Sequence, residues 1–481
     1  MANPATQLAL LLGAAVVAFG GGVAFTRMAA PEPADHQGGP AVPDDPAPPP
    51  PPDPTPSNPG GAAPQGAGAR PQPTVIDGDV RWHRARQRST SAAASDPFDV
   101  PPYLRGVTAA PERQDVTIYD PDRALPGVNL VVSGHAAEAS LIDMKGEVIH
   151  TWARPFDTVW PGPIGPREIR KTHWRRVHLF PNGDLLAIFT IFGVIKIDRD
   201  SNLLWKYRGT CHHDLFVTDD GRIFTLSRRV RRDRDAWIRR NVIDDLITEL
   251  SPDGRLVRQT SLINALLRSP YGVLLSRCPR DTRDVLHTNT IQILDGAHAD
   301  TAPMFAAGRA LVSMRALDTV AVVDLAKSTV TWAMGSLWHK QHEPVLVDGG
   351  RLLLFDNRGH QGTARAIEVD PRTHEVVWEY HGTAETPLIS EGLGTVQRLA
   401  NGNTLITESE SGRALEVTPD GDVVWEYLNP HRAGEDNELI ASLFEVVRFD
   451  WDALDLPAIR ERRAAGVETK RLEELTRGIG K

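Results

Sequence analysis

Two stretches near the C-terminus, RAIEVDPRTHEVVWEY at residues 365–380 and RALEVTPDGDVVWEY at residues 413–427, share one layout. In each, an alternating apolar run leads into a turn that begins Asp-Pro or Thr-Pro, and a second apolar run contains a tryptophan. Period-two alternation on both sides of such a turn is typical of two antiparallel strands. The same phrase occurs upstream at 139–152, 194–207, 247–261 (here without the tryptophan) and 320–334. The chain therefore repeats a strand pair.

The spacing of the copies indicates the architecture. Trp332, Trp378 and Trp425 stand 46 and 47 residues apart, and hairpins of a second type, such as EPVLVDGGRLLLF and VQRLANGNTLITE, lie between the copies. A repeat of about 40–50 residues that carries four strands is the signature of a β-propeller blade. Six copies predict an all-β fold, a six-bladed β-propeller.

The rest of the 481-residue chain differs from the repeats in composition. Proline- and glycine-rich segments cannot bury enough apolar surface to fold, whereas alternating charges are typical of a solvated helix. The predicted organisation is a transmembrane or signal-anchor segment at 1–30, a disordered linker at 31–100, the propeller at 101–453 and a helical tail at 454–481. Deleting the residues after 456 should leave a folded propeller.

The N-terminal segment contains an uncharged apolar run at residues 8–25, near the lower length limit for crossing a bilayer. No Lys or Arg precedes the run, which favours an uncleaved anchor that binds the membrane over a cleaved signal peptide. Arg27 directly follows it, and by the positive-inside rule this single charge points to a cytoplasmic body. The formal charge of −9 gives no reason to expect nucleic acid as a partner.

Equivalent positions in successive blades carry chemically active side chains. Aligning the first hairpin of each blade on its turn glycine gives one slot, occupied by Arg175, His213, His287, His342 and Gly394. A second row, at the end of the following strand, contains Arg228, Arg229, Arg315 and Arg358. Because innermost strands ring the central channel, both rows should converge at one end of it.

Imidazole and guanidinium together suit three kinds of site. Neutral imidazole is a nucleophile or general base, and guanidinium binds oxyanions, so the site could transfer or hydrolyse an anionic ester. His213, His287 and His342 could instead hold a metal ion, with Asp214 or Glu343 as an additional carboxylate. A propeller that only binds an anionic ligand is the third interpretation.

At these residues the chain resembles the arylsulfotransferase family of bacterial enzymes that do not require PAPS. The resemblance covers nearly all of residues 106–450 and includes the phrases NGNTLITE and EVTPDGDVVWEY. It implies a six-bladed propeller exported to the periplasm. It also implies transfer of a sulfuryl group from a phenolic sulfate ester to a phenolic acceptor, without a cofactor.

The resemblance also assigns residues. His287 in LHTNTI, His342 in KQHEP and Arg365 in TARAIEVD match catalytic positions of the family, and His212 and His213 match an HHD phrase. With the repeat slots, this predicts catalytic His213, His287, His342 and Arg365, and substrate-binding His212, Asn289, Arg315 and Arg358. The family's sulfuryl-carrying histidine comes from the last blades, yet residues 382–430 contain no histidine. Another histidine must carry the group, or this branch transfers none; His431 is the nearest.

The chain has two cysteines, Cys211 and Cys278, which the alignment puts in neighbouring blades. Two cysteines exclude a disulfide scaffold and a cysteine-built zinc ribbon. In an exported body the two could form a disulfide, and otherwise they are two thiols.

Overall fold

The computed structural model describes residues 106–162, 172–232, 240–359 and 361–464. Every described residue belongs to one compact unit within residues 88–481. The predicted anchor run and the proline-rich linker lie outside the described residues. No described helix is long and apolar enough to cross a membrane.

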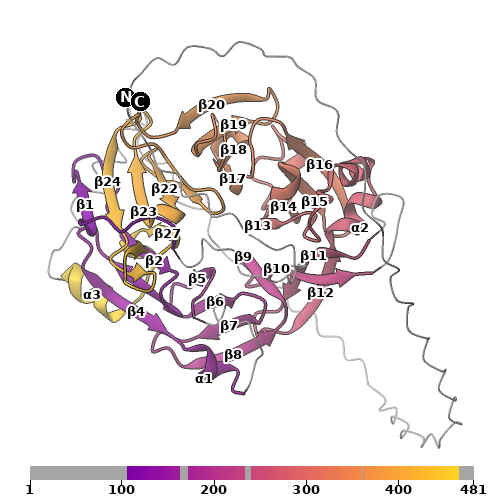
Figure 1. Ribbon diagram of the computed structural model, residues 1–481. Coiled ribbons are helices and arrows are strands. Elements are labelled where there is room, and N and C mark those ends of the chain that lie inside the picture. The colour runs from indigo at the N-terminus through magenta and orange to yellow at the C-terminus, as the bar shows by residue number, and fades with distance from the viewer. Residues whose placement is uncertain (1–105, 163–171, 233–239, 360, 465–481) are drawn as a thin grey trace, which may run out of the picture. The chain divides into compact units, whose positions relative to one another are not determined.

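Six antiparallel sheets are arranged around a central channel, so the prediction of a six-bladed propeller is confirmed (Figure 1). Blade I consists of β27 (Leu443–Phe449), β2 (Val128–Ser133), β3 (Glu138–Ile142) and β4 (Val148–Ala153). Blade II consists of β5 (Val177–Leu179), β6 (Leu185–Phe189), β7 (Gly193–Ile197) and β8 (Leu203–Arg208). Blade III consists of β9 (Cys211–Val217), β10 (Ile223–Arg231), β11 (Val242–Leu250) and β12 (Leu256–Ser261).

The remaining blades follow in chain order. Blade IV consists of β13 (Thr288–Ile293), β14 (Arg309–Met314), β15 (Thr319–Asp324) and β16 (Thr329–Gly335). Blade V consists of β17 (His342–Val347), β18 (Arg351–Asp356), β19 (Arg365–Asp370) and β20 (Glu375–Tyr380). Blade VI consists of β21 (Thr395–Arg398), β22 (Thr404–Glu408), β23 (Arg413–Val417) and β24 (Val423–Leu428), with β1 (Asp115–Tyr119) as a fifth strand.

Helices are short and lie in the turns and loops that precede or follow the strands. The α-helices are α1 (Phe156–Val159), α2 (Leu262–Leu267) and α3 (Pro457–Ala464). The 3-10 turns are η3 (Pro270–Arg277), η4 (Pro303–Phe305), η5 (Arg315–Leu317), η6 (Asp348–Gly350), η7 (Ser409–Ser411) and η8 (Trp451–Ala453). A small hairpin of β25 (Arg432–Ala433) and β26 (Leu439–Ile440) follows blade VI.

Strands from both ends of the described unit close the ring. The C-terminal strand β27 pairs with β2 and becomes the innermost strand of blade I. The N-terminal strand β1 pairs with β24 at the outer edge of blade VI. Each terminal strand thus completes a blade built from the other end of the chain, so opening the ring breaks both ladders. The sequence interpretation did not identify β27 as a blade strand.

In blades I, V and VI the repeated tryptophan joins the blade to the next one. The indole Nε1 of Trp152 in blade I donates to the carbonyl of Gly183 in blade II at 2.9 Å. Trp425 in blade VI donates likewise to Met144 of blade I at 3.0 Å. A tryptophan at the end of the outer strand therefore reaches a turn of the following blade, which explains its spacing along the chain.

The sequence also predicted a helical tail at 454–481 and left open a disulfide between Cys211 and Cys278. In α3, Ile459 is fully buried, and Arg462 forms an ion pair with Asp143 of blade I at 2.6 Å. Cys211 and Cys278 are not joined by a disulfide.

Candidate functional site

Three neighbouring innermost strands are distorted at the same end. The register of β9, β13 and β17 shifts against its partner strand at the level of His213, Asn289 and Glu343. His213 and His287 have φ of 55° and 48°, a left-handed conformation that side chains other than glycine seldom adopt. A β-bulge re-aims the side chains beside it, and strained backbone of this kind is concentrated at functional sites.

These bulges bring the predicted histidines together at one end of the channel. The ring centroids of His213 and His287 are 5.0 Å apart, and those of His212 and His213 are 4.9 Å apart. His342 lies near enough for His287 to help lower its pKa. Asn289 has a different position: its Nδ2 donates to the carbonyl of Gln341 at 2.9 Å, which ties blade IV to the start of blade V.

His342 is held in one tautomer. Asn357 Nδ2 donates to the carbonyls of Ser390 and Leu393, so its Oδ1 faces His342 Nδ1 at 2.6 Å and must accept from it. The lone pair is therefore on Nε2, which is buried and has no hydrogen-bond partner in the described part of the chain. Burial, then Arg315, hold the pKa of His342 well below its ordinary value, so the imidazole stays neutral.

His287 is paired with a carboxylate instead. Its Nδ1 lies 2.8 Å from Asp284 Oδ2, and its side chain is 21% exposed. Burial alone would raise the pKa of Asp284, but His287 and then Arg228 hold it below its ordinary value. With Nδ1–H donated to the Asp284 carboxylate, the lone pair of His287 is on Nε2, so this histidine can accept a proton there and return it.

His213 is the third imidazole of the cluster. Its Nδ1 lies 2.7 Å from Nδ1 of His212, whose Nε2 is 3.5 Å from Asp245 Oδ1. Burial, followed by the charges of His212 and His287, keeps the pKa of His213 well below its ordinary value. His213 is therefore neutral at pH 7 and can donate or accept a hydrogen bond without adding charge.

The three predicted arginines occupy different surroundings. Arg315 is close to the cluster, because its backbone N–H donates to the His287 carbonyl at 3.2 Å and its charge lowers the pKa of His342. Arg358 lies on the rim, 47% exposed, 3.3 Å from Glu391. Arg365 is bound within blade V, where Asp356, Glu379 and the Leu337 carbonyl accept from Nε, Nη1 and Nη2. None of these contacts of Arg365 involves a histidine of the cluster.

Two further arginines face the histidines and were not predicted as site residues. Arg175 lowers the pKa of both His213 and His342, and Arg228 lowers that of His213. The signal for Arg175 was its position in the same slot as the histidines. Arg228 stood in the row of strand-end arginines, and it lies 3.7 Å from Asp284.

Beneath the histidines, Arg176 crosses the channel. Its guanidinium bonds Asp214 of blade III at 2.5 Å, Glu343 of blade V at 2.5 Å and Glu445 of blade I at 2.6 Å. Burial raises the pKa of Glu445 to about 7, an effect that Arg176 opposes and Glu343 reinforces. This group, the Arg176 cluster, separates the histidines from a channel cavity of about 320 Å³.

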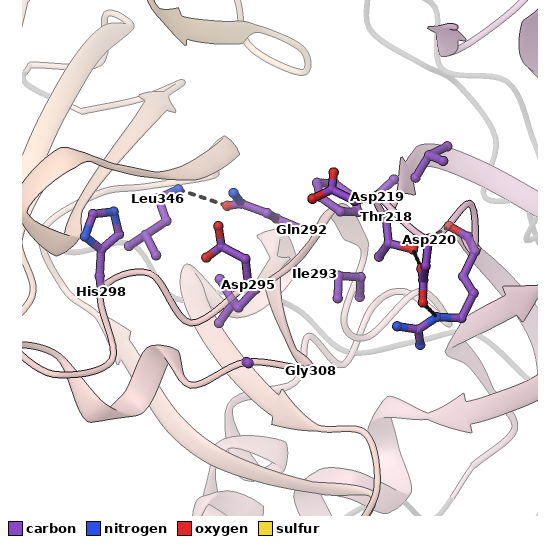
Figure 2. A pocket seen from close by; sticks show the side chains of 14 residues that line it. Thr218, Asp219, Asp220, Gln292, Ile293, Asp295, His298, Gly308 and Leu346 are labelled. Carbon is purple, nitrogen blue, oxygen red and sulfur yellow. Dashed lines mark hydrogen bonds and ion pairs between the residues drawn. The ribbon is translucent and has the colours of Figure 1, made fainter. Parts of the chain in front are cut away.

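A cavity of about 450 Å³ lies away from the histidines. It is formed by the turn after β9 and the loop after β13, at the opposite end of these strands from His213 and His287. Figure 2 shows the side chains of Thr218, Asp220, Asp295 and His298 around it. No predicted site residue lines it.

A metal centre at the axis is not supported by the geometry. Among the described residues, the set of histidines and carboxylates whose ligand atoms all lie within 4.8 Å of one another is His135, Glu138 and His431. His213, His287 and His342 form no such set. Burial lowers the pKa of His135 and of His431 to about 4, so both imidazoles are uncharged at neutral pH. His431 therefore lies beside His135 and Glu138 and not among the axial histidines.

Comparison with known proteins identifies the family of the chain. A family profile described as arylsulfotransferase (ASST) matches residues 176–430, which is more than half of the chain. The chain belongs to the arylsulfotransferase family. No curated protein matches it.

Among solved structures, similar chains include a protein of unknown function from Bacteroides caccae, with 14% identity, a TM-score of 0.43, and 66% of this chain and 97% of that chain covered. A streptogramin B lyase has 11% identity and a TM-score of 0.40, with 70% and 98% covered. The WD40 propeller of Doa1 has 13% identity and a TM-score of 0.37, with 71% and 95% covered.

The resemblance implied an axial histidine from the last blades, and the described residues 382–430 contain none. The last blade supplies no histidine to the cluster, and His431 pairs with His135 and Glu138 instead. The imidazoles at the axis come from blades III, IV and V.

Proposed function

We propose that this protein transfers a sulfuryl group from a phenolic sulfate ester to a phenol, with His342 as the residue that carries the group. Membership of the arylsulfotransferase family supports the reaction class. The observation that carries the assignment is the Nε2 of His342: it is buried, bears a lone pair and has no hydrogen-bond partner among the described residues. A neutral imidazole in this state is a nucleophile ready for use.

In the first half of the reaction, His342 Nε2 attacks the sulfur of the donor ester. The nitrogen–sulfur bond forms while the bond from sulfur to the phenolic oxygen breaks. The leaving phenolate takes a proton from Nε2 of His287, whose imidazolium form Asp284 stabilises at 2.8 Å. In the second half, His287 removes the proton of the acceptor phenol, whose oxygen attacks the sulfur and releases neutral His342. Protons and electrons balance over the cycle.

The sulfuryl oxygens carry negative charge throughout, and they need cationic donors. Arg315 and Arg175 are the arginines whose charges act on His342, so we assign them to these oxygens. A guanidinium group offers fixed N–H donors to an oxyanion, and the bonds strengthen as charge develops in the transition state. We assign His213 to a hydrogen bond with the phenolic oxygen, which a neutral imidazole can either donate or accept.

A chromogenic aryl sulfate, incubated with and without an added phenol, tests the reaction. We expect release of the coloured phenol to depend on the acceptor, and His342→Ala to abolish it. His381→Ala, which removes an exposed histidine of blade V, is the matched control and should leave the rate unchanged. If the reaction is run with the donor ester but no acceptor and is then quenched, mass spectrometry of the digested protein should find the sulfuryl group on the peptide that contains residue 342.

Two results would contradict the proposal. One is a sulfurylated peptide that contains His287 or His213 rather than His342. The other is absence of turnover in the parent protein with every aryl sulfate tried while the ester still binds, which would favour the ligand-binding interpretation.

A further inference from the structure

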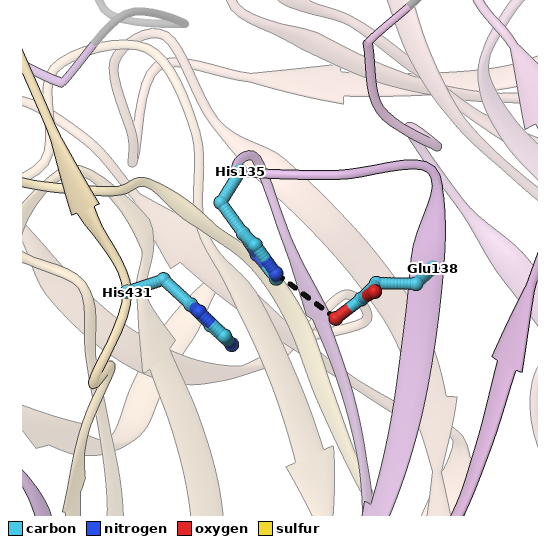
Figure 3. A group of neighbouring side chains, drawn as sticks. All are labelled: His135, Glu138 and His431. Carbon is cyan, nitrogen blue, oxygen red and sulfur yellow. Dashed lines mark hydrogen bonds and ion pairs between the residues drawn. The ribbon is translucent and has the colours of Figure 1, made fainter. Parts of the chain in front are cut away.

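The junction between blade VI and blade I carries a second histidine cluster that sulfuryl transfer does not use. His135 lies in the turn between β2 and β3, Glu138 is the first residue of β3, and His431 follows β24 (Figure 3). One ligand atom of each lies within 4.8 Å of the others. We refer to these three residues as the junction cluster.

One nitrogen of the junction cluster, Nδ1 of His135, carries a lone pair that accepts no hydrogen bond from the described residues. His135 Nε2 lies 2.9 Å from Glu138 Oε1 and donates its proton there, since a carboxylate can only accept. A neutral imidazole has a single N–H, so Nδ1 bears a lone pair. This Nδ1 is buried and has no hydrogen-bond partner among the described residues. Burying an unsatisfied acceptor is costly, and a cation would remove that cost.

The two imidazoles of the junction cluster lie side by side. The imidazoles of His135 and His431 are stacked with centroids 3.3 Å apart and planes 9° apart (Figure 3). The lone pairs of an imidazole lie in its ring plane, so both rings must turn out of the stack for their nitrogens to meet at one ion.

The backbone on either side is pinned. Asn429 Nδ2 donates to Ser133 Oγ and to the carbonyl of Ala441, each at 2.8 Å. The Ala441 N–H donates to the carbonyl of His431 at 3.1 Å. Because these bonds join the end of blade VI to blade I, the backbone that carries the ligands is held in place before any ion arrives.

The charge and the space suit one divalent ion. Asp115 of β1 lines the same pocket as the junction cluster and, with Glu138, supplies two carboxylates beside two imidazoles. The pocket has a volume of about 60 Å³. A volume of about 10–15 Å³ already holds a water molecule, so an ion with a bound water fits.

We infer that the junction cluster binds one Zn²⁺ ion through His135 Nδ1 and an imidazole nitrogen of His431, with Glu138 orienting the His135 ring through its Nε2–H. Imidazole nitrogens are preferred ligands of Zn²⁺, whereas Mg²⁺ and Ca²⁺ prefer oxygen ligands. The ion joins blade I to the end of blade VI, next to the strands that close the ring. Its role is therefore to stabilise the closed propeller.

Calorimetric titration tests the site. Protein dialysed against a chelator is titrated with ZnCl₂, and in parallel with MgCl₂. We expect one Zn²⁺ per chain and no measurable Mg²⁺. We also expect the melting temperature to rise by about 5 °C at zinc concentrations about 100 times the dissociation constant. His135→Ala and His431→Ala should abolish zinc binding, and Glu138→Gln should weaken it at least about tenfold.

The controls separate this site from the axial cluster. His381→Ala and His287→Ala should both keep the zinc stoichiometry of the parent. Glu138→Gln preserves shape, and its melting curve in chelator should match that of the parent, so it carries the test if an alanine variant does not fold. Zinc binding that survives loss of His135 and His431, that disappears with His287, or that is absent from the parent would overturn the inference.

Discussion

Arg315 and Arg365 have the same side chain, but their surroundings assign them different tasks. The guanidinium of Arg365 is bonded to Asp356, Glu379 and the Leu337 carbonyl, and Asp356 is fully buried. Arg315 lies beside His287 and His342. Family position favours Arg365 as the residue that binds sulfate, whereas the geometry favours Arg315.

We expect Arg315→Ala to lower turnover of an aryl sulfate by about tenfold to about 150-fold, with little change in melting temperature. A charge-assisted hydrogen bond to an oxyanion is worth about 1.5–3 kcal/mol, and it strengthens in the transition state. Arg315→Lys keeps the charge without the planar donors, so it should recover only part of the rate. Steady-state kinetics on both variants measure the effect, and an unchanged rate in Arg315→Ala would contradict the assignment.

Arg365→Ala should have the opposite signature. It leaves the buried carboxylate of Asp356 without its cation, which destabilises the fold by about 3 kcal/mol. Denaturant unfolding should show that loss, while the activity per folded molecule stays close to that of the parent. A large loss of turnover at unchanged stability would instead show that Arg365 binds the substrate.

At the scale of elements, the innermost strands are joined by charge as well as by packing. Arg176 directly precedes β5, and its partners Asp214, Glu343 and Glu445 stand on β9, β17 and β27. One cation meets three carboxylates, so the cluster has an excess of negative charge. Burial and the neighbouring carboxylates therefore favour the protonated form of Glu445, whose pKa is about 7.

This cluster makes stability depend on pH. The pKa of Glu445 in the folded protein lies above the ordinary glutamate value of 4.5, so folding favours the protonated form. The resulting stabilisation is fully present below about pH 4.5 and is lost as the pH rises through about 7. Glu445→Gln cannot lose a proton, so its melting temperature relative to the parent should rise from pH 5 to pH 8. At about 1.4 kcal/mol for each pKa unit, the change amounts to a few kcal/mol.

The exposed Glu385→Gln provides the control, because its melting temperature should follow that of the parent at both pH values. A Glu445→Gln variant that loses stability relative to the parent as the pH rises would show that Glu445 is ionised in the folded protein.

For the whole molecule, the order in which the C-terminal residues are removed should matter. A chain that ends at Ala464 keeps every described contact and should melt like the parent. A chain that ends at Leu456 loses the buried Ile459, a cost of about 2–5 kcal/mol, and the ion pair of Arg462 with Asp143. It should remain a folded propeller with a lower melting temperature.

A chain that ends at Ser442 loses β27 and, with it, the innermost strand of blade I and Glu445. We expect it to show no cooperative unfolding, because both the strand ladder at the closure and the Arg176 cluster are broken. Circular dichroism during heating distinguishes the three cases, and a cooperative transition in the shortest chain would contradict this account of the closure.

The sequence alone determined the fold class, because that information is local and repeated. The alternating runs and the tryptophan spacing require only neighbours along the chain, and six copies point to one architecture. The common slot of His213, His287 and His342 was visible for the same reason, since equivalent positions in a propeller converge on its axis.

Contacts between distant segments could be decided only by the tertiary structure. Strand β27 pairs with β2, more than 300 residues earlier, and no local pattern marks such a partner. Whether Arg365 meets a substrate or a buried aspartate depends on which side chains surround it. Likewise His431, the nearest candidate for the missing histidine of the last blade, lies beside His135 because ring closure puts the end of blade VI against blade I. A sequence pattern specifies which groups a blade presents; the closed ring decides what they meet.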